Sequence, residues 1–207
     1  MLRSSRAVLA AAACLVSLSV FADTANAAQG LFMFDLQSRP SLHDSKPRPG
    51  YKLKSNKVRL APEFRRQIVA YKSNQKAGTI IVNTGEKHLY LVLGDGKALR
   101  YGIGTARDGF EWSGTHKVSN KREWPGWTPP AEMKVRQPNL PDYMPGGINN
   151  PLGARAIYIG STLYRIHGTN EPWTIGQDVS SGCIRMVNDD VEDLYERVKI
   201  GAKVIVL

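Results

Sequence analysis

The chain has 207 residues, of which 28 are Lys or Arg and 18 are Asp or Glu, so its formal net charge is +10. It contains only two cysteines, which excludes a disulfide framework and a cysteine-rich zinc site. The basic charge suits an anionic partner such as a cell-wall polymer or equally a generally basic soluble surface, and no nucleic-acid motif accompanies it.

Residues 1–27 have the parts of a secretory signal. Two arginines precede a short apolar run, and an A-x-A cleavage site ends at Ala27. The run is shorter than the about 20 apolar residues that a membrane-spanning helix needs. We therefore expect a soluble monomer, exported to the periplasm or cell-wall space, with no integral membrane segment after cleavage. Cleavage also removes Cys14, so Cys183 is the one thiol expected in the exported protein.

Residues 28–77 are expected to form a linker and an N-terminal extension. Residues 28–56 are rich in Pro, Ser, Lys and Arg and lack sustained periodicity, which is typical of a flexible linker. Residues 64–71 contain a short apolar stretch that predicts a strand or turn docking on the domain that follows. We expect that domain to span residues 78–207.

From Gly78 onward the pattern predicts β-strands. Short apolar or alternating runs are separated by turn residues, as at the hairpin 94–96. This spacing indicates a mainly β fold, an antiparallel β-sandwich or barrel-like sheet with one or two short helices. We expect the last strand to be central in the sheet. The expected strands are 79–82, 88–93, 98–103, 156–159, 163–167 and 203–207.

Residues 105–150 are expected to form long ordered loops, because they hold most of the Trp, Pro and Gly residues. Such loops either line a substrate site or pack against the domain, and both alternatives stay open for Trp124 and Trp127. Beyond them, Asp189 is expected to cap a helix, with Glu192 three residues later, and Gly201 to end it. The apolar stripe of this helix is Val191, Leu194, Tyr195 and Val198.

Cys183 and His167 are the candidate catalytic pair, sixteen positions apart in a segment rich in Gly, Ser and Asn. A thiol is a weak nucleophile at neutral pH, and His167, at the end of an expected strand, can act as its base. Ser181, Gly182 and Cys183 offer consecutive N–H groups for an oxyanion hole. We expect this arrangement to lower the pKa of the Cys183 thiol.

Arg185 lies two residues after the cysteine and adds a permanent cation. It can lower the thiol pKa or bind a substrate carboxylate, or it can be a surface ion-pair partner of Asp189 or Asp190. His43, His88, His116 and His167 lack metal-binding spacing, so we expect no metal and no cofactor. His88 and His116 are interpreted as structural or surface residues.

The chain resembles the L,D-transpeptidases (YkuD-like), which are bacterial cell-wall enzymes. The resemblance covers about residues 78–207 and rests on Asn-Pro-Leu-Gly at 150–153, Tyr-Arg-Ile-His-Gly-Thr-Asn at 164–170 and Ser-Ser-Gly-Cys-Ile-Arg-Met at 180–186. It implies that Cys183 attacks the L-centre carbonyl of the third residue of a peptidoglycan tetrapeptide stem and releases the terminal D-Ala. His167 is then base and acid, and an amine on a neighbouring stem accepts the acyl group in a 3→3 cross-link.

The resemblance also implies roles for other residues. The carbonyl of Gly168 orients the imidazole, and the oxyanion donors are Ser181, Gly182 and Cys183. The family pattern often has a second histidine where this chain has Ser181, so an acid–base role is not expected there. The expected substrate-binding residues are Arg185, Tyr164, Asn170, Trp124 and Trp127.

Three functions stay open at this point. Transpeptidation is the first. The second uses the same thioacyl intermediate with water, a free D-amino acid or a protein as acceptor, as in an L,D-carboxypeptidase or an enzyme that attaches proteins to the wall. The third is a non-catalytic wall-binding protein, against which the combination of His167, Cys183 and Arg185 argues.

Overall fold

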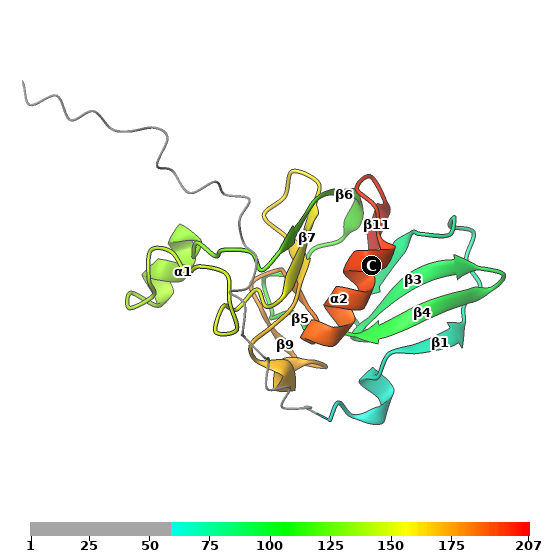
Figure 1. The fold of residues 1–207 in the computed structure, drawn as a ribbon, viewed down its shortest axis with the longest axis horizontal. Helices are drawn as coiled ribbons and strands as arrows, with labels where there is room; N and C mark the ends of the chain where they lie inside the picture. Colours follow the sequence, from blue (N-terminus) through cyan, green and yellow to red (C-terminus); the bar gives the residue numbers. More distant parts are fainter. Residues whose placement is uncertain (1–58) are drawn as a thin grey trace, which may run out of the picture. The chain divides into compact units, whose positions relative to one another are not determined.

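The computed structural model describes residues 59–207. The expected signal peptide 1–27, the expected linker 28–56 and His43 lie outside the described residues. Within this part the chain is mainly β, with two short α-helices, which confirms the expected fold class (Figure 1).

Nine strands form one sheet in the order β1-β4-β3-β2-β11-β6-β7-β8-β10, and two strands form a small second sheet, β5-β9. The strands of the large sheet are β1 (Gln67–Ala70), β2 (Ile80–Asn83), β3 (His88–Gly94), β4 (Lys97–Gly102), β6 (Gly114–Glu123), β7 (Arg155–Ile159), β8 (Arg165–His167), β10 (Ile184–Arg185) and β11 (Lys203–Val206). The remaining elements are β5 (Thr105–Ala106), β9 (Asp178–Ser180), α1 (Ala131–Arg136), α2 (Asn188–Arg197) and the 3-10 turns η1 (Pro62–Phe64) and η2 (Pro172–Thr174).

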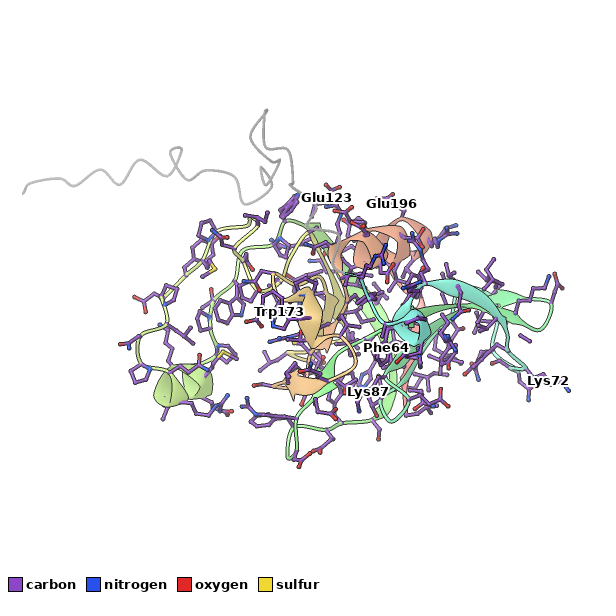
Figure 2. The ribbon with its side chains drawn as sticks, turned by 90° about the horizontal axis from the view of Figure 1, so that it is seen from below. Phe64, Lys72, Lys87, Glu123, Trp173 and Glu196 are labelled. Carbon is purple, nitrogen blue, oxygen red and sulfur yellow. The ribbon has the colours of Figure 1, made fainter. Side chains whose placement is uncertain are left out.

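Strands β2, β3 and β4 form the antiparallel meander that the apolar pattern predicts. The β3–β4 hairpin turns through Asp95, which has a φ of 50°, a region that Asp tolerates better than most residues. β1 pairs antiparallel with β4, so a strand does dock before residue 78. Phe64, on the turn that leads into β1 (labelled in Figure 2), packs against His88 with ring centroids 5.6 Å apart.

The sheet is mixed rather than wholly antiparallel, so that part of the sequence prediction is wrong. β11 is central, as expected, but it runs parallel to β2 and antiparallel to β6. β10 runs parallel to β8. In both parallel pairs the two strands lie far apart in sequence and are joined by long connections, which a parallel pair requires.

β6 is a ten-residue strand that the sequence does not predict. It lies within the expected loop region 105–150 and pairs with both β11 and β7. Only Val118 in this strand is buried, and most of its other residues are polar. Its position is fixed by backbone pairing on both edges rather than by an apolar stripe, so hydrophobic periodicity gives no signal for it.

Helix α2 packs against β7 and β8. Its apolar stripe is confirmed, because Val191 and Leu194 are buried in the core. The expected cap at Asp189 is wrong, since the helix begins at Asn188 and no side chain caps it. The Oδ1 atom of Asn188 instead accepts hydrogen bonds from the backbone N–H groups of Ala154 and Thr169, at 3.0 and 3.2 Å.

The main hydrophobic core combines residues from both halves of the sheet with the apolar face of α2. Leu89 of β3, Ile157 of β7 and Val191 of α2 all belong to it and are fully buried. A second cluster lies on the other face of β2, β3 and β4 and includes Ile81 and Tyr90. No helix within residues 59–207 is both long and apolar enough to cross a bilayer.

Candidate active site

The parallel pairing of β8 with β10 brings the candidate catalytic residues to one face of the sheet. In this pair Ile184 lies opposite Ile166 and Arg185 lies opposite His167. Because side chains alternate along a strand, the two isoleucines face the core, while His167 and Arg185 face the other side. Cys183 directly precedes β10, and the same register continued by one residue sets it beside Arg165.

His167 is 4% exposed, and its Nδ1 atom lies 2.5 Å from the carbonyl oxygen of Gly168. A carbonyl only accepts, so Nδ1 carries the proton and donates, which leaves Nε2 of the neutral ring free to accept one. The pKa of His167 is lowered to about 3, mainly by burial; the Gly168 carbonyl opposes this shift, and the charges of Arg185 and Arg165 add to it. The imidazole is therefore neutral at neutral pH, as a general base must be.

Cys183 is the one free cysteine in the described part of the chain and is half-buried. Its Sγ atom lies 4.0 Å from the carbonyl oxygen of Leu163. Burial raises the pKa of the thiol, while the charge and N–H groups of Arg165 and the charge of Arg185 favour the thiolate. The net direction is upward, so the expectation of a lowered pKa is wrong for the resting site. Burial disfavours charge on both the sulfur and the imidazole, which favours a neutral pair.

Ser180 stabilises the turn 180–183, which carries the candidate nucleophile Cys183. The Oγ atom of Ser180 accepts a hydrogen bond from the N–H of Gly182 at 3.2 Å and donates one to the carbonyl of Cys183 at 2.5 Å. The N–H of Gly182 is thus engaged. Within residues 59–207, the N–H groups of Ser181 and Cys183 have no hydrogen-bond partner, so these two remain available to a developing oxyanion.

An aromatic pair supports the same turn. The rings of Trp112 and Tyr164 stack with centroids 4.3 Å apart, and Nε1 of Trp112 donates a hydrogen bond to the Gly182 carbonyl at 2.6 Å. Gly182 has a φ of 105°, and a Cβ atom there would overlap the Tyr164 ring. A glycine is therefore required directly before the nucleophile. The sequence analysis does not predict this role of Trp112. The Trp-Ser-Gly turn at 112–114 was the one feature that could have indicated it.

The described site matches a known family. A family model for the YkuD L,D-transpeptidase catalytic domain covers residues 77–206. The chain belongs to the L,D-transpeptidase family. The resemblance identified from the three motifs is thus confirmed.

Curated relatives of this L,D-transpeptidase family member carry the same family name. The Escherichia coli protein named "Probable L,D-transpeptidase ErfK/SrfK" is 41% identical over 137 residues, which is 62% of this chain and 43% of that protein. The Escherichia coli protein named "Probable L,D-transpeptidase YcfS" is 33% identical over 186 residues, which is 85% of this chain and 55% of that protein. The chain spans about half the length of these relatives.

Among solved structures, one from Brucella melitensis is 46% identical and covers 74% of this chain and 100% of that one, with a TM-score of 0.48. It is described as a probable carnitine operon oxidoreductase, a name that differs from the family name of the matched sequences. With a TM-score below 0.5, this likeness carries no weight, and the L,D-transpeptidase assignment rests on the sequence matches.

Arg185 of this L,D-transpeptidase domain is already paired. Its Nη1 atom lies 3.1 Å from Oε2 of Glu171. The alternative pairing with Asp190 is wrong, because the buried carboxyl of Asp190 faces Arg66 at 3.7 Å. Asp189 likewise forms no ion pair with Arg185 within the described residues. The charge of Arg185 is therefore partly neutralised before any substrate arrives.

The other expected substrate-binding residues are dispersed. Tyr164 lies against Gly182, beside the nucleophile. Asn170 is exposed and donates from Nδ2 to the carbonyl of Asn149 at 3.1 Å. Trp124 is 9% exposed, and its backbone N–H donates to the carbonyl of Ala154, whereas Trp127 pairs with Met144 within the long loop. Of this set, only Tyr164 and Arg185 are tied to the catalytic turn by these contacts.

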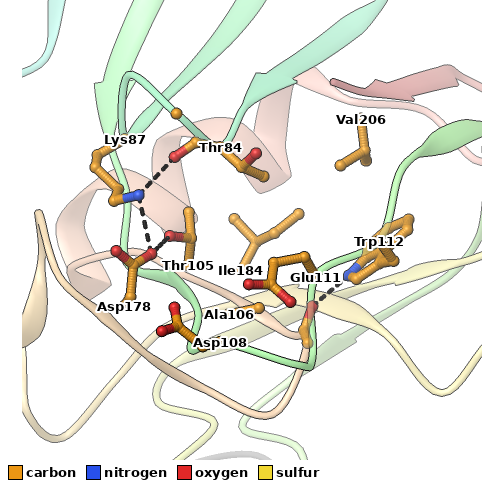
Figure 3. A pocket seen from close by; sticks show the side chains of 12 residues that line it. Thr84, Lys87, Thr105, Ala106, Asp108, Glu111, Trp112, Asp178, Ile184 and Val206 are labelled. Carbon is orange, nitrogen blue, oxygen red and sulfur yellow. Dashed lines mark hydrogen bonds and ion pairs between the residues drawn. The ribbon is translucent and has the colours of Figure 1, made fainter.

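A cavity of about 190 Å³ lies next to the catalytic turn (Figure 3). Gly182 and Ile184, the neighbours of Cys183, line it, but Cys183 does not. Lys87 pairs with Asp178 at 2.9 Å, and the carboxylates of Asp108 and Glu111 also line it. Among the described residues, no cluster of His, Cys, Asp and Glu suits a metal ion.

Proposed function

We propose that this chain is a peptidoglycan L,D-transpeptidase that forms 3→3 cross-links through a thioacyl-enzyme on Cys183. One observation carries the proposal. A buried, neutral imidazole, with Nδ1 fixed by the Gly168 carbonyl, lies on the strand next to the nucleophile's turn and on the same face of the sheet. Such a pair supports nucleophilic catalysis by a cysteine.

In the acylation step, Nε2 of His167 takes the thiol proton as Sγ of Cys183 attacks the L-centre carbonyl of the third stem residue. A C–S bond forms, and the carbonyl oxygen becomes an oxyanion that the N–H groups of Ser181 and Cys183 can stabilise. The C–N bond to the terminal D-Ala then breaks, and His167 returns the proton to the leaving amine. A single oxyanion donor of this kind is worth about 2.7–4 kcal/mol of barrier.

In the transfer step, the side-chain amine of a diaminopimelate on a neighbouring stem attacks the thioester carbonyl. His167 accepts the amine proton, the C–S bond breaks, and the proton returns to the Cys183 sulfur. The enzyme is then restored without a cofactor or metal. This chemistry requires peptidoglycan as partner, and the signal at 1–27 supports export to the periplasm or cell-wall space.

The neutral pair supports proton transfer during the attack rather than a stored thiolate. Because the thiol stays protonated at rest, it is protected from oxidation until a donor carbonyl is positioned. The substitution of the family's second histidine by Ser181 keeps a backbone donor at that position. Its hydroxyl oxygen lies 3.5 Å from Nη2 of Arg136, which ties helix α1 to the site.

The test is incubation of the exported chain with disaccharide tetrapeptides, followed by mass analysis of the products. A cross-linked dimer supports transpeptidation, whereas tripeptide alone supports an L,D-carboxypeptidase, and incorporation of an added D-amino acid or a protein amine supports the other acceptors. Absence of any product together with an unmodified Cys183 contradicts the proposal and favours a wall-binding protein.

Cys183→Ala and His167→Gln serve as paired variants for this test. Each is expected to lower the rate of D-Ala release by about 10⁴-fold or more, because nucleophile and base act as a unit. The matched control is His88→Gln, since His88 lies on β3 and packs on Phe64, outside the pair. Equal rates for His167→Gln and the unaltered protein would remove His167 from the mechanism.

A further inference from the structure

Arg165 is a half-buried cation beside the proposed nucleophile, and the proposed chemistry does not use it. Four arginines have an Nε atom that is buried without a hydrogen-bond partner: Arg100, Arg155, Arg165 and Arg185. The terminal nitrogens of Arg100 bind the Glu63 carbonyl. Those of Arg155 pair with Glu123 and Glu192, and those of Arg185 pair with Glu171. Within residues 59–207, Arg165 alone of the four has no oxygen partner and no ion pair.

The guanidinium of Arg165 is held in place without being neutralised. Its Cζ atom lies 5.3 Å from the centroid of the Tyr158 ring, and these two residues are register partners between β8 and β7. A cation–π contact restricts the side chain without neutralising its charge, and the Nε–H group has no hydrogen-bond partner. His167 lies two positions after Arg165 on β8, so the two side chains face the same side of the sheet.

The same guanidinium faces the sulfur of Cys183, whose thiolate it favours through charge and hydrogen bonding. The other cations near the turn differ from Arg165: Arg185 is paired with Glu171, and Arg136 is an exposed side chain that contacts the Ser181 hydroxyl. The position of Arg165 next to Cys183 therefore limits its contacts to groups of the donor that lie near the attacked carbonyl.

We propose that Arg165 is a specificity-determining residue that binds the free terminal carboxylate of the acyl donor. This inference rests on the proposed function. In the donor, that carboxylate belongs to the residue expelled in acylation and lies one residue beyond the attacked carbonyl. One residue spans at most about 3.6 Å, which suits a guanidinium on the strand position opposite Cys183 in the β8–β10 register. A planar guanidinium binds a carboxylate through two parallel hydrogen bonds.

This role has a consequence for donor length. A stem with one further residue would carry an uncharged amide where the carboxylate should lie, and the five donors of Arg165 would lack an anionic partner. A site built to pair a buried polar group discriminates strongly against a ligand that lacks the matching group. The enzyme therefore selects donors that end one residue after the attacked carbonyl.

The experiment compares two donors, a disaccharide tetrapeptide with a free terminal carboxylate and the same compound with a terminal carboxamide. For the unaltered protein we expect kcat/KM to be about 30- to 100-fold higher with the free carboxylate. Arg165→Gln should lose most of this preference, through a drop with the carboxylate donor and a change of less than about threefold with the amide. Arg165→Lys should retain part of the preference, and Arg122→Gln, an exposed arginine on β6, should retain all of it.

A binding measurement separates this inference from the proposed function. In Cys183→Ala, calorimetry with both donors reports recognition without turnover, and Arg165→Gln in that background should equalise the two dissociation constants. Equal losses with both donors would show that Arg165 acts on the thiol and would overturn the inference, as would unchanged binding of the carboxylate donor. If the unaltered protein turns over neither donor yet Arg165→Gln equalises binding, the transpeptidase function fails while the carboxylate site stands.

Discussion

The two halves of the nine-stranded sheet, which meet at β11, use their side chains in opposite ways. In the half formed by β2, β3 and β4, long antiparallel ladders bury apolar residues on both faces, such as Leu89 on one and Tyr90 on the other. In the half that ends in β8 and β10, one face joins the core and the other carries His167 and Arg165. From this difference we infer that the regular, apolar half supplies much of the fold's stability. The second half can therefore hold polar groups that are buried and incompletely hydrogen-bonded.

The largest expected effect comes from weakening the apolar half. Leu89→Ala removes a fully buried side chain from the core and should lower the free energy of unfolding by about 2–5 kcal/mol, measured by urea denaturation. The rate of D-Ala release per folded molecule should stay unchanged. The control is Leu93→Ala on the same strand, where the side chain is 38% exposed, with a loss below about 1 kcal/mol. A large loss of rate after Leu89→Ala would mean that the two halves are not functionally separate.

A smaller effect is expected from the catalytic turn. In Gly182→Ala, the added Cβ meets the Tyr164 ring at a φ of 105°, so the turn must shift the nucleophile. We expect kcat/KM for D-Ala release to fall about 10- to 100-fold, which corresponds to about 1.4–2.8 kcal/mol. Gly201→Ala is the matched control, because Gly201 has a φ of 88° and open space around it. That variant should lose stability but keep its rate, and a similar loss of rate in both variants would contradict this account.

The smallest effect concerns pH. His167 has a folded-state pKa of about 3, below its ordinary value of about 6.5, so the unfolded chain binds its proton first and stability falls as pH drops below about 6.5. Burial raises the pKa of Asp190 to about 6, so this carboxyl binds its proton first in the folded state and acts in the opposite direction.

The two contributions can be separated with two variants. Between pH 6.5 and 5.5, the stability difference between the unaltered protein and His167→Gln should shrink by about 1 kcal/mol, as followed by urea denaturation. The corresponding difference for Asp190→Asn should move the other way. A difference that is constant with pH for His167→Gln would mean that the imidazole is not desolvated in the folded protein.

The apolar half of the sheet is also easier to predict from the sequence than the half that carries His167. The apolar runs at 79–82 and 88–93 correspond closely to β2 and β3, because burial on both faces leaves a strong hydrophobic signal. β6 leaves almost none, since only Val118 is buried. α1 has no buried residue at all, and its six residues follow two prolines, so it was not separable from a loop.

The candidate catalytic residues were predictable in part. Cys183 and His167 stand out as the one remaining thiol and an imidazole at the end of a strand, and the structure brings their strands together. The partner of Arg185 was not predictable, because Glu171 lies fourteen residues away in a loop whose path no periodic pattern defines. That Arg165 has no ion-pair partner among the described residues was not predictable either, because no sequence pattern indicates that a charge is unpaired.

The central position of β11 has a consequence for how the chain folds. This strand follows all the others in sequence, yet it hydrogen-bonds to β2 on one edge and to β6 on the other. Until it inserts, the sheet consists of two fragments, each with an unpaired strand edge open to intermolecular pairing. Joining β11 to β2 requires contacts between residues more than a hundred positions apart, which slows assembly and leaves these strand edges exposed in the meantime.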